Sequence, residues 1–113
     1  MKAIKIGIES VECVEIEPTL DALQAQVGGY IQYLPVVDGI AAYIDEEGKF
    51  KPDAKVNPVA TGLAHSVIGI ASDDVIVGTM LLVGDDGEGG EADVPESALQ
   101  LVEACRSGVQ GNA

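Results

Sequence analysis

The sequence of 113 residues has no tryptophan and is poor in the residue types on which metal and nucleophilic sites depend. It contains one histidine, His65, and two cysteines, Cys13 and Cys105, which lie far apart and match no metal-ligand spacing. No His-x-Glu, Cys-x-x-Cys or His-Glu-x-x-His pattern occurs, which argues against a zinc or iron site. We therefore expect a protein that is not an enzyme, with no catalytic residues, no bound metal and no cofactor.

Basic side chains are also scarce, with 6 Lys and Arg against 19 Asp and Glu and a formal net charge of −13. A surface this negative repels phosphate backbones and anionic lipid, so we expect no direct binding to nucleic acid or membranes. No apolar run approaches the roughly 20 residues that cross a bilayer, and we find no signal-peptide pattern. We expect a cytoplasmic protein with reduced thiols.

Apolar residues make up 47% of the chain and aromatic residues only 4%, so the core must consist of aliphatic side chains. Residues 2–9 alternate, with isoleucines on one face. Residues 13–17 repeat the pattern, with Val14 and Ile16 inward. This period of two predicts two half-buried strands joined as a β-hairpin.

A second hairpin is predicted from residues 30–37 and 40–44, because the Asp-Gly pair between two apolar runs is a strong turn signal. Residues 75–83 are apolar without alternation, which predicts a central strand buried on both faces. Gly78 within this run indicates a bulge or the close approach of a backbone or ligand.

Three helices are expected. Thr19 is a predicted N-cap of a helix that ends at Gly28, and Asn57 followed by proline predicts the start of the second. The third begins near residues 93–96, with Leu99 and Val102 inward. We expect an α+β fold: a mainly antiparallel sheet with β-hairpins and about three short helices packed on it. Residues 1–107 would form a single domain and residues 108–113 a frayed tail.

Two weak candidates for chemistry remain. His65 with Cys13 would be a nucleophile–base pair only if the fold brought them together, and an ordinary surface or helix-end histidine is the commoner case. The acidic, glycine-rich residues 85–93 resemble an oxygen-rich calcium loop in composition but lack its alternating acids, so we interpret them as a solvated loop.

Four segments resemble an uncharacterised family of small domains found in phages, plasmids and actinobacteria. They are residues 20–24 running into 27–31, the Asn-Pro-Val-Ala-Thr run at 57–61, residues 76–79 continuing to 82–85, and the acidic loop that ends at residues 93–95. The resemblance implies no defined activity. It implies a context of mobile elements, in which small non-enzymatic proteins often counter host defence.

On this basis we expect a binding protein that sequesters a small ligand, such as a nucleotide-derived immune signal. Its ligand-binding residues would be glycines, polar residues at a helix start and tyrosines able to stack on a base, namely Gly28, Gly29, Tyr30, Tyr33, Asn57, Thr61, Gly78 and Thr79. The alternatives are an acidic DNA mimic that inhibits a host defence nuclease, and a structural or regulatory interaction module. The partner is thus a small nucleotide-like molecule or a host defence protein, and we expect a homo-oligomer because the apolar residues 31–44 need cover.

Overall fold

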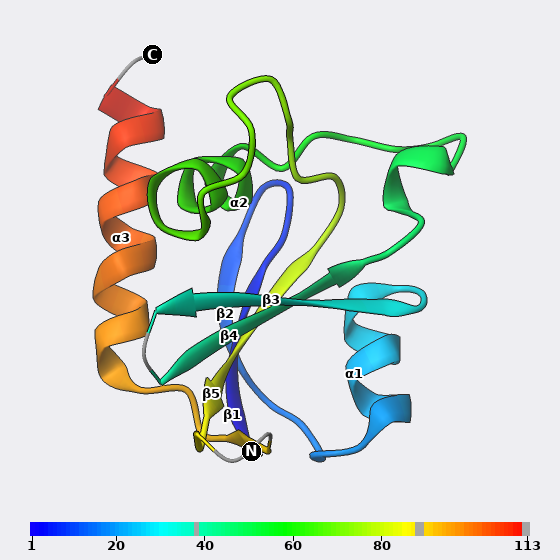
Figure 1. Cartoon of the computed structure of the whole chain (residues 1–113), viewed down its shortest axis with the longest axis vertical. Helices are drawn as coiled ribbons and strands as arrows, with labels where there is room; N and C mark the ends of the chain where they lie inside the picture. The colour runs from blue at the N-terminus through cyan, green and yellow to red at the C-terminus, as the bar shows by residue number, and fades with distance from the viewer. Residues whose placement is uncertain (38, 88–89, 112–113) are drawn as a thin grey trace.

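The computed structural model describes residues 1–37, 39–87 and 90–111 and has an α+β fold (Figure 1). In this part of the chain six strands form one antiparallel sheet in the order β2–β1–β5–β4–β3, and β6 pairs with the end of β5. The elements in chain order are β1 (Lys2–Ile6), β2 (Val11–Glu15), α1 (Leu20–Val27), β3 (Ile31–Val37), β4 (Ile40–Asp45), the 3₁₀ turn η1 (Gly48–Phe50), α2 (Pro58–Leu63), the π-helical turn η2 (Ala64–Ile68), β5 (Met80–Asp85), β6 (Glu91–Ala92) and α3 (Glu96–Gly111).

Both predicted hairpins are present. β1 pairs with β2, and β3 pairs with β4 across the expected turn, of which Asp38 lies outside the described residues. β3 carries a register irregularity between Pro35 and Val37, since a proline cannot donate to a strand ladder. The predicted inward positions Val14 and Ile16 are confirmed, because both pack in the core.

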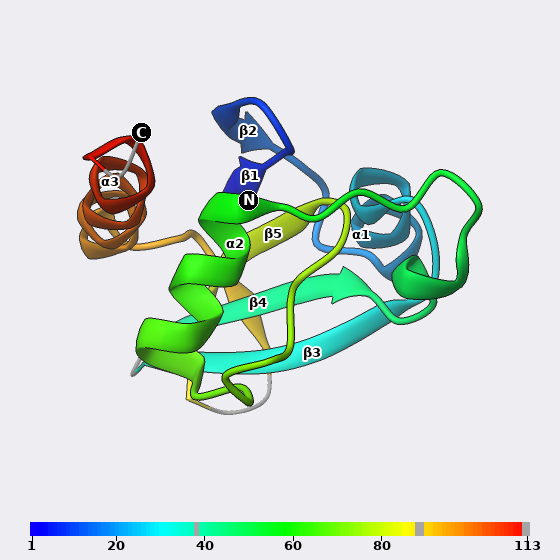
Figure 2. The same cartoon turned by 90° about the horizontal axis from the view of Figure 1, so that it is seen from above.

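The sheet has a core on each face. On one face β1, β4 and β5 supply aliphatic side chains such as Ile4 and Leu82, which pack with α2 and α3. On the other face Leu23 and Val27 of α1 pack on the sheet, beside Tyr43. Figures 1 and 2 show α2 and α3 side by side, with α1 at the other end of the molecule. The single sheet is therefore covered from both sides by short helices.

β5 is the central strand, and its first four residues are fully buried, as predicted. The strand begins at Met80, however, and not at residue 75. The backbone of Ile76 binds Thr61 and Asn57 and not a neighbouring strand, and Gly78 turns the chain with a φ of 79°. Asn57, which caps α2, and Thr61 within α2 thus hold the backbone of Ile76 before β5 starts.

The helix boundaries follow local signals. Thr19 caps α1 by accepting a hydrogen bond of 3.2 Å from the N–H of Ala22, and Gly28 ends the helix with a φ of 94°. Asn57 caps α2 with proline in the first turn. Both starts and the first stop are confirmed as predicted.

α3 presents a different face from the expected one. Ala98 and Val102 are fully buried, whereas Leu99 is 37% exposed, so its predicted inward orientation is wrong. Ala98 precedes Val102 by four residues, which is one helical turn, and this register turns Leu99 outward. The helix also continues to Gly111, into the stretch where we expected a frayed tail.

Among the residues the structure describes, no helix is long and apolar enough to cross a membrane.

Candidate functional site

Asn57, one of the expected ligand-binding residues, is fully buried and joins three parts of the backbone. Its Nδ2 donates hydrogen bonds of 2.9 Å to the carbonyl oxygens of Ile6 and Gly78. Its Oδ1 accepts a hydrogen bond of 3.1 Å from the N–H of Ala60. Because both polar atoms of the side chain are used inside the fold, Asn57 holds β1, α2 and Gly78 together and offers no free donor to a ligand.

Thr61 has a similar internal role one turn later. Its Oγ1 accepts a hydrogen bond of 3.0 Å from the N–H of Ile76 and donates one of 3.3 Å to the carbonyl oxygen of the same residue. The N–H of Asn57 also donates to that oxygen, at 2.8 Å. These bonds fix the backbone just before Gly78, so Asn57 and Thr61 position the segment that contains Gly78 and Thr79.

The pair Gly28 and Gly29 lies against the end of β4. Lys51 Nζ donates a hydrogen bond of 2.8 Å to the carbonyl oxygen of Gly28 and forms an ion pair with Asp45. The Asp45 side chain is only 5% exposed, and its Oδ1 accepts a hydrogen bond of 2.9 Å from the N–H of Glu47. A Cβ on Gly29 would lie 2.9 Å from Asp45 Oδ1, so this close approach requires a glycine.

The charge of Asp45 is maintained against its burial. Desolvation alone would raise the pKa of this carboxyl, but hydrogen bonds from Lys51 and from the N–H of Glu47, together with the positive charge of Lys51, lower the pKa below its ordinary value of 3.8. The carboxylate therefore stays ionised at neutral pH and anchors Lys51 at this position.

A cavity of about 330 Å³ opens between Lys51, Lys55, Gly78 and Thr79, and we call it the lysine cavity. The backbone N–H of Gly78 donates a hydrogen bond of 3.0 Å to the carbonyl oxygen of Lys55, which holds the two chain segments side by side. The remaining lining residues are Ile8, Val27, Asp45, Gly48, Asp53, Ala54 and Val77. The cavity thus joins the Gly28 region to the Gly78 region through Lys51.

Two polar groups at the lysine cavity are available to a ligand. Within the described part of the chain, neither the Lys55 ammonium nor the Thr79 hydroxyl makes a hydrogen bond or an ion pair. Asp45 and Asp53 offset the charge of the two lysines, so the cavity is near neutral in a chain whose net charge is −13. This arrangement can accept an anionic or polar group of a small molecule.

The two expected tyrosines do not lie together. Tyr30 follows Gly29, its carbonyl oxygen accepts a hydrogen bond of 2.8 Å from the N–H of Glu46, and its side chain is 66% exposed. Tyr33 instead lines a second cavity of about 330 Å³, which also contains Tyr43, Asp85 and Glu91. Of the expected residues, Gly78 and Thr79 line the lysine cavity, Gly28 and Gly29 flank it, and Tyr33 belongs elsewhere.

The second cavity, which we call the tyrosine cavity, is built from cross-strand neighbours. Tyr33 and Tyr43 are register partners, with ring centroids 6.0 Å apart in an edge-to-face arrangement. The hydroxyl of Tyr43 donates a hydrogen bond of 2.6 Å to Glu91, and that of Tyr33 donates one of 3.1 Å to Asp85. Burial, followed by the bond to Glu91, raises the pKa of Tyr43 well above its ordinary value of 10.0.

Lys51, Lys55 and Asp45 were not predicted as members of the candidate site. Asp45 lies more than thirty positions before Gly78, and no spacing rule connects residues so far apart. One signal was present: three of the six basic residues fall within residues 49–55, a local enrichment in an acidic chain.

The weak candidates for chemistry stay separate. His65 Nε2 lies 2.8 Å from the carbonyl oxygen of Asp74, whereas Cys13 is exposed on β2 and lines another hollow. Among the residues the structure describes, no three His, Cys, Asp or Glu side chains are grouped to hold a metal ion. Glu88 and Gly89 of the acidic loop lie outside that part of the chain.

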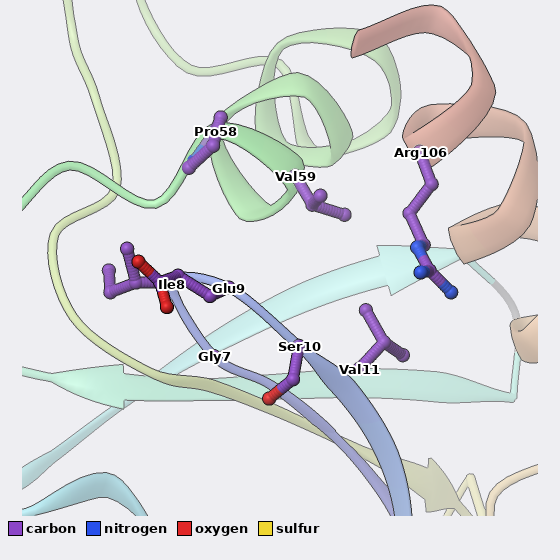
Figure 3. A pocket seen from close by; sticks show the side chains of 8 residues that line it. All are labelled: Gly7, Ile8, Glu9, Ser10, Val11, Pro58, Val59 and Arg106. Atoms are coloured by element: carbon purple, nitrogen blue, oxygen red, sulfur yellow. The ribbon is translucent and has the colours of Figure 1, made fainter. Parts of the chain in front are cut away.

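A smaller hollow of about 170 Å³ lies between the β1–β2 turn, the start of α2 and the C-terminal half of α3. Figure 3 shows Arg106 reaching from α3 towards Val11 of β2, with Val59 of α2 on the other side. The guanidinium of Arg106 lies 3.1 Å from Glu103 on the same helix, so its charge is partly balanced.

Comparisons with known proteins bear on the family alone. A search of curated proteins and a search of solved structures each found no match. The family described as a domain of unknown function, DUF3846, matches residues 1–105. This range includes all the strands of the described residues and the residues that line both the lysine cavity and the tyrosine cavity. The chain belongs to the DUF3846 family of domains of unknown function.

Proposed function

We propose that this protein is a non-enzymatic binding protein that sequesters a small, nucleotide-like ligand in the lysine cavity. The observation that carries the proposal is the position of Lys51 and Lys55, two of the six basic residues of a strongly acidic chain, at one cavity. The Lys55 ammonium makes no ion pair within the described residues, so it is free to meet an anionic group. A volume of about 330 Å³ suits a small molecule and not a polymer.

Each group at the cavity has a distinct part in the proposed binding. Lys55 and the hydroxyl of Thr79 would contact a phosphate or a ring substituent of the ligand. Lys51 is held by Asp45 and by the carbonyl oxygen of Gly28, so its position is set before the ligand arrives. The ring of Tyr30 is largely exposed, but Tyr30 does not line the cavity, so the proposed binding does not depend on stacking by this ring.

The biological context of the proposal comes from the family resemblance. Domains of this kind in phages and plasmids would act in the host cytoplasm, where a nucleotide-derived immune signal is a target for sequestration. A protein that sequesters such a signal needs to bind it tightly and needs no catalytic group. An enzyme would need a nucleophile, base or metal set at the cavity, and its described lining offers lysines, aspartates and a threonine in place of a histidine or cysteine.

The alternative, an acidic DNA mimic, draws on the acidic pairs of the chain. Asp45 and Asp74 line one hollow around Lys49, whereas Asp85 lies at the opposite end of the sheet, because Gly84 pairs with Ile40 and Met80 pairs with Ile44. Asp45 and Asp74 are also paired with lysines. A row of free acids on one face, which mimicry of a phosphate array requires, therefore has less support than the small-ligand cavity.

A thermal-shift screen against cyclic dinucleotides, cyclic ADP-ribose isomers and NAD tests the proposal. A ligand at a hundred times its Kd adds about 2.7 kcal/mol to the free energy of unfolding, which gives a clear rise in Tm. We expect one nucleotide to raise the Tm of the wild type and to have a reduced effect on Lys55→Gln. If no nucleotide changes the Tm, the proposal is wrong, and a protein partner whose binding weakens steeply with salt becomes the better candidate.

A further inference from the structure

The outer edge of β2 carries unpaired backbone groups. Met1 and Ile16 exchange two hydrogen bonds, of 2.8 and 2.9 Å, and the β1–β2 register then alternates bonded and non-bonded pairs along the hairpin. The N–H and C=O groups of Val11, Cys13 and Glu15 therefore point away from β1. Among the described residues β2 pairs with β1 alone, so three donors and three acceptors line an open strand edge.

The other edge of the sheet is protected from pairing. β3 contains Pro35, which has no N–H, and its register shifts between Pro35 and Val37. Proline and bulges are the usual means by which edge strands avoid additional partners. β2 has neither feature over residues 11–15. The contrast leaves β2 as the one edge of this sheet, within the described chain, that can accept a further strand.

Two separate hollows lie beside the β1–β2 hairpin on the side of α3, and we call them together the α3 groove. The first is a hollow of about 420 Å³, and Leu99, which is 37% exposed, lines it. Its other lining residues include Ile4, Cys13, Val94 and Pro95. The second is the hollow in Figure 3, which lies between the β1–β2 turn, the start of α2 and α3, and in which Arg106 points towards Val11. A strand added to β2 would place alternate side chains in this groove, because side chains alternate between the faces of a sheet.

The charge along the edge selects the occupant. Glu12 and Glu15 are exposed on β2, and Glu9 and Glu17 are exposed on either side of it. Glu15 lies 3.3 Å from the N-terminal ammonium, which leaves the other three acids without an ion pair in the described chain. A basic segment would bring opposite charge to these acids, whereas a second copy would add the same four glutamates to the edge.

We propose that the β2 edge and the adjoining α3 groove form a docking surface for an extended, basic segment of a partner protein, which binds by strand addition. Main-chain hydrogen bonds to Val11, Cys13 and Glu15 give the affinity, and an apolar side chain beside Leu99 with basic side chains beside Glu12 gives the specificity. This surface is separate from the lysine cavity and does not depend on the function proposed for it.

Amide hydrogen exchange with a model peptide tests the proposal directly. In the free protein the amides of Val11, Cys13 and Glu15 should exchange quickly, and those of Glu12 and Val14 slowly. A short peptide that alternates lysine and valine should protect the three outward amides. A peptide that alternates lysine and proline has the same charge but lacks half of the strand donors, and it should not protect them.

Two variants separate strand pairing from simple charge attraction. Cys13→Pro removes one outward N–H and should weaken binding of the lysine–valine peptide by about tenfold or more. Because this variant can fail to fold, the double variant Glu9→Lys with Glu12→Lys is the second test, and it should weaken binding of the lysine–valine peptide. Glu46→Lys with Asp73→Lys is its control, with the same change of net charge away from the β2 edge. The control should bind within about twofold of the wild type.

Three outcomes would overturn the proposal. The first is no binding of the lysine–valine peptide to the full chain at low salt. The second is equal binding of the lysine–proline peptide, which would reduce the effect to charge alone. The third is protection of the outward amides that grows with protein concentration in the absence of peptide, which would assign the edge to a second copy of this chain.

Discussion

Asn57 Nδ2 donates a hydrogen bond of 2.9 Å to the carbonyl oxygen of Gly78, although the two residues lie 21 positions apart and Asn57 is fully buried. The same nitrogen donates a hydrogen bond of 2.9 Å to the carbonyl oxygen of Ile6 at the end of β1. One side chain therefore ties the first strand, the second helix and the segment before the central strand, which also forms a wall of the lysine cavity.

Removal of this connection should cost much of the stability of the domain. Asn57→Ala removes the side-chain donor to the carbonyl oxygens of Ile6 and Gly78 and the cap to Ala60, and we expect a loss of about 2–4 kcal/mol in the free energy of unfolding. Asn57→Asp keeps the cap to Ala60 but places a carboxylate against the same oxygens, so it should be at least as damaging at neutral pH. Urea unfolding measures both. A loss below about 0.5 kcal/mol in both variants would contradict the role assigned to Asn57.

The ion pair between Asp45 and Lys51 predicts a pH dependence of stability. The folded-state pKa of Asp45 is below its ordinary value of 3.8, so the folded protein binds this proton less readily than the unfolded chain. The stabilisation is therefore complete above pH 3.8 and is lost as the pH falls through the folded pKa. Asp45→Asn should cost about 2 kcal/mol at pH 7, and its difference from the wild type should shrink in acid.

Unfolding curves at neutral and acidic pH give this difference. Asp53→Asn is the matched control, because Asp53 is exposed, lines the same cavity and makes no ion pair within the described chain. A difference between wild type and Asp45→Asn that does not change with pH would show that the carboxylate acts through its shape and not through its charge.

Local signals made much of this fold predictable. The side chain of Thr19, the positive φ of Gly28 and the cap at Asn57 each depend on neighbours within four residues, and all three were predicted from the sequence. The start of β5 was not. Its boundary is set by bonds from Asn57 and Thr61 to Ile76, which link residues fifteen or more positions apart.

The same distinction applies to the candidate site. Gly78 was identified because a glycine inside an apolar run indicates a bulge or a close approach. It does line the lysine cavity, but the position calls for glycine because of its φ of 79°, and no atom lies within 4 Å of where a Cβ would be. Asn57 was expected to contact a ligand because capping residues also make anion sites, but its side chain is occupied by Ile6, Gly78 and Ala60. Whether a polar side chain faces inward or outward at a helix start depends on what packs there, which the sequence does not state.

Tyr43 predicts a loss of stability in alkali. Its pKa is raised above 10.0, mainly by burial and then by the bond to Glu91, so the folded protein retains this proton where the unfolded chain loses it. Its contribution is complete below pH 10.0 and declines as the pH rises towards the folded pKa. The wild type should therefore lose stability above this pH faster than Tyr43→Phe, which has no ionisable group.

Guanidinium unfolding at neutral and alkaline pH measures this effect. Tyr30→Phe is the control, since the side chain of Tyr30 is largely exposed. Tyr43→Phe itself should cost about 1 kcal/mol at neutral pH, because it leaves Glu91 without its phenol donor. Parallel pH curves for the wild type and Tyr43→Phe would contradict the predicted coupling of Tyr43 to alkaline unfolding.

Two substitutions at the lysine cavity, Lys55→Gln and Asp53→Asn, should change ligand affinity in opposite directions. If an anionic ligand binds there, Lys55→Gln removes an attractive charge and should weaken binding by about tenfold, whereas Asp53→Asn removes a repulsive one and should strengthen it. Lys5→Gln on β1 has the same charge change as Lys55→Gln and should have little effect, because Lys5 does not line the cavity. Calorimetric titration with the nucleotide found by thermal shift gives all three affinities. Equal losses for Lys5→Gln and Lys55→Gln would mean that only net charge matters, and the ligand would then have to bind outside the lysine cavity.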